Sequence, residues 1–195
     1  MNNYPEYVEI KGKQYKINTD FKVAIKCNQI ATDKTIGEYE RPLAIIYTLF
    51  GDEGLNDVDN YESLLNLAIK YLSCGKEIKT TDENKDMDYI QDYGYVWASI
   101  YSDYHGLDID KEKIHWWKFN ELMNGLSNSE MGNCCILNRI RNLRNMDISD
   151  IKDEKERNKI IKAKNQVALI KEEKEITLTD KQKESVDEFY KALGF

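Results

Sequence analysis

Hydrophobic and polar positions alternate only near the start of the chain. Val8 and Ile10 are separated by a polar residue, and so are Tyr15 and Ile17. The intervening Gly12-Lys13 pair suits a two-residue turn that begins with glycine. The pattern therefore predicts a β-hairpin over about residues 7–17. Because a lone hairpin is marginal in water, we expect it to lie on helices or to pair with another chain's edge.

Beyond the hairpin, apolar residues recur at helical spacing. A first helix is predicted from residue 21 to about 31, capped by Asn18, Thr19 or Asp20. A second is predicted from Pro42 to Gly51. It is apolar nearly all round, which predicts the central helix of a bundle. The fold class that follows is mainly α, a helical bundle with a short N-terminal β-hairpin.

The next two predicted helices each carry one apolar stripe. The first stripe begins at Tyr61 and ends before Gly75. The second helix covers residues 87–104. Gly94 lies inside it and is expected either to allow the close approach of another helix or to mark a bend. Its stripe consists of Ile90, Tyr93, Trp97, Ile100 and Tyr104. We expect Trp97 to belong to the core.

Residues 115–126, HWWKFNELMNGL, place two tryptophans side by side on one helix. At about 100° per residue, Trp116, Phe119 and Met123 share a face, which predicts that they are core residues. Trp117 then points elsewhere. It either packs under another helix of the same chain or lies on a partner-binding surface, where tryptophan is enriched.

Two further helices are expected in the second half of the chain. Ser127 and Glu130 have capping-box spacing and predict a helix through residue 143. Arg139 falls inside its apolar arc, so we expect it to snorkel or to pair with a carboxylate. The helix also contains RIRNLR, the best nucleic-acid candidate, although a structural salt bridge is the favoured interpretation.

From residue 151 onward the chain is strongly charged and has only a thin apolar seam, which predicts a solvent-facing helix. A last helix after Thr179 carries Phe189, Tyr190 and Leu193 on one stripe. The predicted organisation is a compact helical domain over residues 1–150, with residues 151–195 as a possible appendage.

Composition narrows the function classes. The 195 residues carry a formal net charge of −7, which argues against a phosphate-binding surface and makes nucleic acid an unexpected partner. The four cysteines form no CxxC pair and are expected to be reduced and buried. The first residues do not have the basic-then-apolar pattern of a leader, and the longest apolar run is too short for a membrane helix. We expect a soluble cytoplasmic protein.

Motifs for chemistry are missing. His105 and His115 lie on different predicted elements without a metal-ligand pattern. Neither a glycine-rich phosphate loop nor a nucleophile elbow occurs. The sequence therefore predicts no enzyme, cofactor or metal site.

Three blocks carry a family resemblance. VEIKGKQYKINTDFKVAIK near the start is followed by YVWASIYSDYHGLDI and IHWWKFNELMNGLS. In this order and separation they resemble the bacteriophage gene product fifteen family, over roughly residues 4–170. The helix after Thr179 lies beyond the matched part.

The resemblance implies a protein of long-tailed phages or prophages, encoded near the tail genes. Proteins in that position are typically tail assembly chaperones, which hold the tape measure protein until tail-tube subunits displace them. The expected partner is the tape measure protein, with the major tail protein and a homo-oligomer as further options. Trp117, Phe189, Tyr190 and Leu193 are the predicted partner-binding residues. The alternatives are a minor tail protein retained in the virion and a nucleic-acid-binding regulator.

Overall fold

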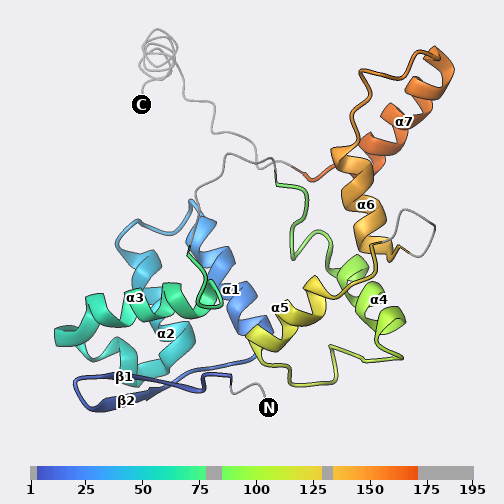
Figure 1. Cartoon of the computed structure of the whole chain (residues 1–195). Coiled ribbons are helices and arrows are strands. Elements are labelled where there is room, and N and C mark those ends of the chain that lie inside the picture. The colour runs from blue at the N-terminus through green and yellow to red at the C-terminus, as the bar shows by residue number, and fades with distance from the viewer. Residues whose placement is uncertain (1–3, 78–84, 129–133, 171–195) are drawn as a thin grey trace, which may run out of the picture.

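The computed structural model describes residues 4–77, 85–128 and 134–170, and within them the fold is mainly α, as the sequence predicts (Figure 1). A two-stranded antiparallel hairpin precedes the helices. The elements are β1 (Tyr7–Ile10), β2 (Lys13–Lys16), α1 (Phe21–Thr32), α2 (Glu40–Leu55), the short 3-10 helix η1 (Val58–Asn60), α3 (Tyr61–Leu72), α4 (Tyr93–Asp103), α5 (Trp116–Asn124), α6 (Ile136–Asn145) and α7 (Glu154–Val167). Among the described helices, none combines the length and the apolar character that a bilayer crossing requires.

The hairpin lies on helices of its own chain. Val8 pairs with Tyr15 in its antiparallel register, and Ile10 and Tyr15 are buried against the helical core. Lys13 Nζ lies 2.9 Å from Asp57 Oδ2, and the Tyr15 hydroxyl donates to the same carboxylate. These contacts stabilise the otherwise marginal pair of strands. The expected packing on helices is therefore confirmed.

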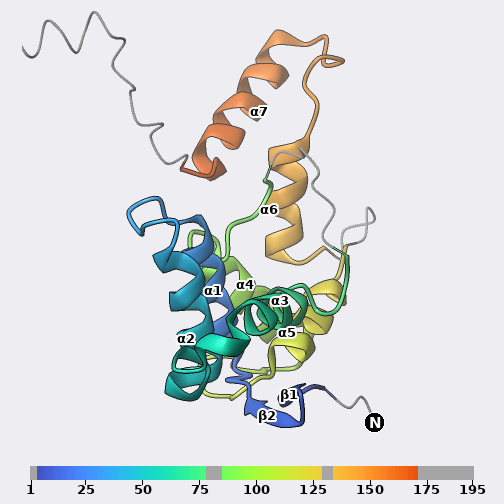
Figure 2. The ribbon, with the colours of Figure 1, turned by 90° about the vertical axis from the view of Figure 1, so that its left-hand side faces the viewer.

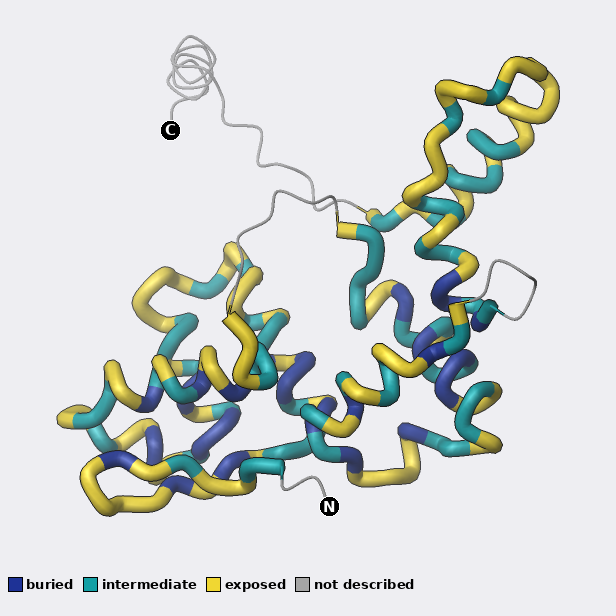
Figure 3. The backbone as a smooth tube through the Cα atoms, viewed as in Figure 1, coloured by how far each residue is buried: buried dark blue, intermediate teal, exposed yellow. Residues whose placement is uncertain are grey.

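Helix α2 packs between α1 and α3, but it is not the central helix that its composition predicts. Ile46 and Leu49 are 1% exposed. Toward solvent, Leu43 is 40% and Tyr47 51% exposed. Figure 3 shows buried and exposed stretches alternating along the helices of this part of the chain. The all-round apolar pattern was misleading because the solvent-facing side of α2 is also apolar.

Helix α4 begins at Tyr93, later than predicted, and its buried face is rotated from the predicted one, with Ile100 common to both. Its buried residues are Val96, Ser99 and Ile100, whereas Ile90 is 50% exposed. The orientation follows from Asp92, which is 1% exposed and directs the start of α4 toward an ion pair. Gly94 falls in the first turn, where an added Cβ would meet no atom within 4 Å, so it marks neither a close contact nor a bend.

Trp97 is only half-buried as a consequence of this rotation. Its ring stacks on Tyr101 with centroids 4.9 Å apart, and its Nε1 donates to Asp108 Oδ1 at 3.0 Å. Trp97 thus packs at the edge of the core instead of inside it.

Helix α6 begins at Ile136, so Ser127 is not its cap; Glu130, the second member of the predicted capping box, lies outside the described residues. The Cys135 Sγ accepts the Asn138 N–H and caps the helix. Ser127 has other partners, because its N–H donates to Asp103 Oδ2 at 2.8 Å and its carbonyl accepts the Cys135 N–H at 3.0 Å.

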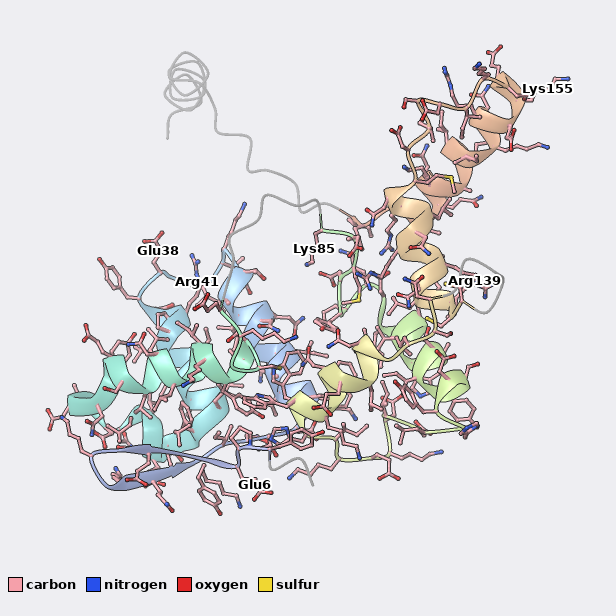
Figure 4. The ribbon with its side chains drawn as sticks, viewed as in Figure 1. Glu6, Glu38, Arg41, Lys85, Arg139 and Lys155 are labelled. Carbon is pink, nitrogen blue, oxygen red and sulfur yellow. The ribbon has the colours of Figure 1, made fainter. Side chains whose placement is uncertain are left out.

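The prediction that Arg139 lies in the apolar arc is also wrong. Arg139 is exposed on the outside of α6 (Figure 4). The face turned toward the body carries Leu137, Arg141 and Arg144, spaced four and three residues apart. Arg144 forms the buried pair, with its two terminal nitrogens each 2.7 Å from an oxygen of Asp92.

Helix α7 has no buried residue, which confirms the predicted solvent-facing helix with a thin apolar seam. It runs back alongside α6, and the two helices project from the body as an arm (Figures 1 and 2). Polar contacts join them: the Arg144 Nε donates to the Val167 carbonyl, and Lys164 to that of Met146. The division into residues 1–150 and 151–195 stays a prediction.

Candidate protein-interaction surface

The described residues contain no constellation for metal or nucleophilic chemistry. No group of three or more histidine, cysteine or acidic side chains among them is placed to hold a metal ion. None of the four cysteines, all of which lie in the described part of the chain, forms a disulfide. Burial raises the pKa of the Cys27 thiol to about 12, which makes it a poor nucleophile. His115 uses both ring nitrogens: Nδ1 accepts the Trp117 N–H, and Nε2 donates to the Pro5 carbonyl.

The adjacent tryptophans perform one structural task together. The Trp116 Nε1 donates to the Leu72 carbonyl and the Trp117 Nε1 to the Tyr71 carbonyl, each at 2.9 Å. Both acceptors lie in the last turn of α3, where carbonyls have no partner within the helix. The Trp117 ring also stacks on Tyr71, with centroids 6.2 Å apart. The pair therefore caps the C-terminal end of α3.

The two helices that carry the most distinctive sequence blocks begin side by side. The Phe21 N–H donates to the Ile114 carbonyl at 2.9 Å, and the Trp116 N–H to the Thr19 carbonyl at 2.8 Å. One turn further along, the rings of Phe21 and Phe119 stack with centroids 4.3 Å apart. The N-terminal block and the HWWKF block thus form one junction between α1 and α5.

This junction lies within the segment that identifies the family. The model of the family described as Bacteriophage Gp15 protein matches residues 1–169. The chain belongs to this bacteriophage family. Neither a curated protein nor a solved structure shows a significant match to the phage protein. The recognised resemblance is thereby confirmed.

The predicted site residues lie in different environments in this phage protein. Trp116 (3% exposed) and Phe119 (0%) lie in the core, whereas Met123 is half-buried beside it. Trp117 is half-buried against α3, which favours the intramolecular alternative over a partner surface. The remaining predicted partner-binding residues, Phe189, Tyr190 and Leu193, lie outside the described residues.

An apolar row on the outer face of α2 is a better candidate for partner binding. It consists of Tyr39 (90% exposed), which immediately precedes α2, together with Leu43 (40%) and Tyr47 (51%), and we call it the α2 stripe. Residues four positions apart lie on one side of a helix, so the three side chains form a continuous line. Among the exposed large hydrophobic residues of the described chain, these three share a single helix face.

The α2 stripe leads into a groove of about 970 Å³, which we call the α2 groove. The groove lies between the base of the hairpin, α1, α2 and the segment before α5. Its apolar part is formed by Ile17, Val23, Tyr47, Leu49 and Phe50. Gly51, with φ 67°, interrupts α2 at this point. The Leu49 carbonyl beside it accepts the Asn18 N–H at 2.8 Å and holds the wall of the groove to the chain before α1.

The stripe and the groove have the properties of a protein-binding surface. Polar, charged and apolar side chains line the groove together, and the apolar α2 stripe runs up to its edge, an arrangement in which an amphipathic helix can dock. Sequence reasoning missed this surface because it assigned the whole of α2 to the core. The signal that could have revealed it was the pair of tyrosines, Tyr39 and Tyr47, whose hydroxyls favour a water-facing position.

Proposed function

We propose that this phage protein is a tail assembly chaperone that holds the tape measure protein in soluble form until tail-tube subunits displace it. Membership of the phage family supports the setting. The observation that carries the proposal is the α2 stripe, an apolar helix face that lies beside a groove and that none of the described residues covers. The proposed location is the cytoplasm of the bacterial host, and the proposed fate is absence from the mature virion.

The size of the surface suits transient binding of a partner. Three partly exposed side chains and a shallow groove offer much less apolar area than an obligate interface buries. A helical partner presents residues at matching three- and four-residue spacing and can lie along such a row. Affinity of this kind permits dissociation when tube subunits compete for the partner.

Co-expression with the tape measure protein encoded by the same phage tests the proposal. The variant combines Tyr39→Ser, Leu43→Ser and Tyr47→Ser, and its control is Ile69→Ser, an exposed apolar residue (42%) on α3. We expect the wild type and the control to keep the tape measure protein in the supernatant, whereas the triple variant leaves it in the pellet. Equal recovery with the triple variant would exclude the α2 stripe as the binding surface.

Two further measurements separate the alternative classes. Mass spectrometry of purified virions should find no copies of the protein, whereas a structural tail protein would be retained. Binding to DNA that falls steeply with salt concentration would instead indicate a nucleic-acid-binding regulator.

A further inference from the structure

Three lysines converge on the α2 groove from three different elements. Lys16 comes from β2, Lys26 from α1, and Lys113 from the segment before α5. The groove also contains two carboxylates, Glu6 and Asp52. Cations therefore outnumber anions here, although the chain as a whole carries a net charge of −7.

Among the described residues, the three groove lysines are unpaired, as are other lysines such as Lys70 and Lys118, but the groove brings three of them together. Lys13, Lys22, Lys85 and Lys111 each lie within 4.0 Å of an aspartate oxygen. None of the three groove lysines makes such an ion pair with any residue that the structure describes. Their ammonium groups remain available for carboxylates of a partner that occupies the groove.

We propose that the α2 groove selects an acidic amphipathic helix, and this inference rests on the proposed function. A volume of about 970 Å³ holds several side chains but not a whole helix. The helix therefore lies along the α2 stripe and inserts one apolar row beside Tyr47. Its flanking carboxylates reach Lys26 and Lys113, so that charge determines which segments of the tape measure protein bind.

The probe is a set of overlapping fluorescein-labelled peptides of about 25 residues that together cover the tape measure protein. Their fluorescence anisotropy is measured as the full-length protein is titrated in. The tightest binders should be amphipathic and carry acidic flanks. Charge reversal of either groove lysine that the helix should reach, Lys26→Glu or Lys113→Glu, should weaken their binding about fivefold. The matched control Lys159→Glu, exposed on α7, should change binding less than about twofold.

A charge swap makes the test specific. Peptides whose flanking acids are replaced by lysine should bind the Lys26→Glu, Lys113→Glu double variant better than they bind the wild type. If peptides bind with no preference for acidic flanks and the reversals leave their affinity unchanged, the inference is wrong while the chaperone function stands.

Two other outcomes would also overturn the inference. If neither the peptides nor the full tape measure protein binds, the proposed function fails and the inference fails with it. If single-stranded DNA of equal charge displaces the peptides as readily as an unlabelled acidic peptide, the lysines form a general polyanion site and the selection of acidic helices is excluded.

Discussion

The N-terminal lobe and the α6–α7 arm are stabilised by different forces. In the lobe, which comprises the hairpin, α1, α2, α3 and α5, rings such as Phe21 and Phe119 are fully buried and stacked. In the arm, α7 has no buried residue, and Arg144 attaches the arm to the body through Asp92. Apolar burial dominates one region, whereas a buried ion pair, side-chain hydrogen bonds and the buried Leu137 attach the other.

This difference shows what the distinctive sequence blocks do. The HWWKF block and the N-terminal block both lie in the lobe, where they cap α3 and join α1 to α5. Their role is structural. The candidate partner surface lies beside them, on the outer face of α2, where the sequence is less distinctive.

Phe119→Ala should have the largest effect on stability. The ring is 0% exposed and lies between Phe21 and Trp116, so truncation leaves a cavity and lowers the free energy of unfolding by about 4 kcal/mol. Urea denaturation measures this change, with the exposed neighbour Lys118→Ala as control. A loss below about 1 kcal/mol would show that the junction does not stabilise the lobe.

Arg144→Met should destabilise by about 3 kcal/mol, because the Asp92 carboxylate remains buried without its cation. The loss of hydrogen-exchange protection should be concentrated in α6 and α7. Arg139→Met changes the same residue type on the exposed side of α6 and should have little effect. Equal effects of the two substitutions would contradict the role given to the ion pair.

Trp117→Phe should lower stability by about 1 kcal/mol, because the hydrogen bond to the Tyr71 carbonyl is lost while most of the ring packing remains. Thermal unfolding followed by circular dichroism provides the measurement. Capture of the tape measure protein should be unchanged. Loss of capture without loss of stability would restore Trp117 as a partner-binding residue.

The smallest effect concerns Asp108. A hydrogen bond from the Trp97 indole, together with Lys111, lowers the pKa of this carboxyl to about 2. Its contribution to stability is therefore present above about pH 4 and is lost as the pH falls through the folded-state pKa. Asp108→Asn should be less stable than the wild type at neutral pH, and the difference should shrink near about pH 2. A constant difference across that range would contradict the assignment.

The sequence predicted the elements better than their faces. The hairpin follows from the alternation of apolar and polar residues, and the mainly α fold follows from helical spacing. The start of α1 at Phe21 follows from the cap at Asp20. The buried faces of α4 and α6 could not be predicted in this way. They depend on the ion pair between Asp92 and Arg144, which lie 52 residues apart in the sequence. No local periodicity contains that information.

The candidate site was still harder to predict from the sequence. An apolar residue such as Leu43 has the same helical spacing whether it faces a core or a partner, so periodicity assigned it to the core. The groove depends on where the chain around Asn18 meets Leu49, which is a tertiary contact. Conversely, the sequence left open whether Trp117 packs within the chain or on a partner, because its contact, the end of α3, lies more than forty residues away in sequence.

The central claim is that the α2 stripe, and not the tryptophan pair, holds the tape measure protein. The most direct test compares the Tyr39→Ser, Leu43→Ser, Tyr47→Ser variant with Trp117→Phe in the same co-expression experiment, after thermal unfolding has shown that both are folded. We predict that the tape measure protein stays soluble with Trp117→Phe and sediments with the α2 variant. The reverse result, sedimentation with Trp117→Phe and solubility with the α2 variant, would contradict the account.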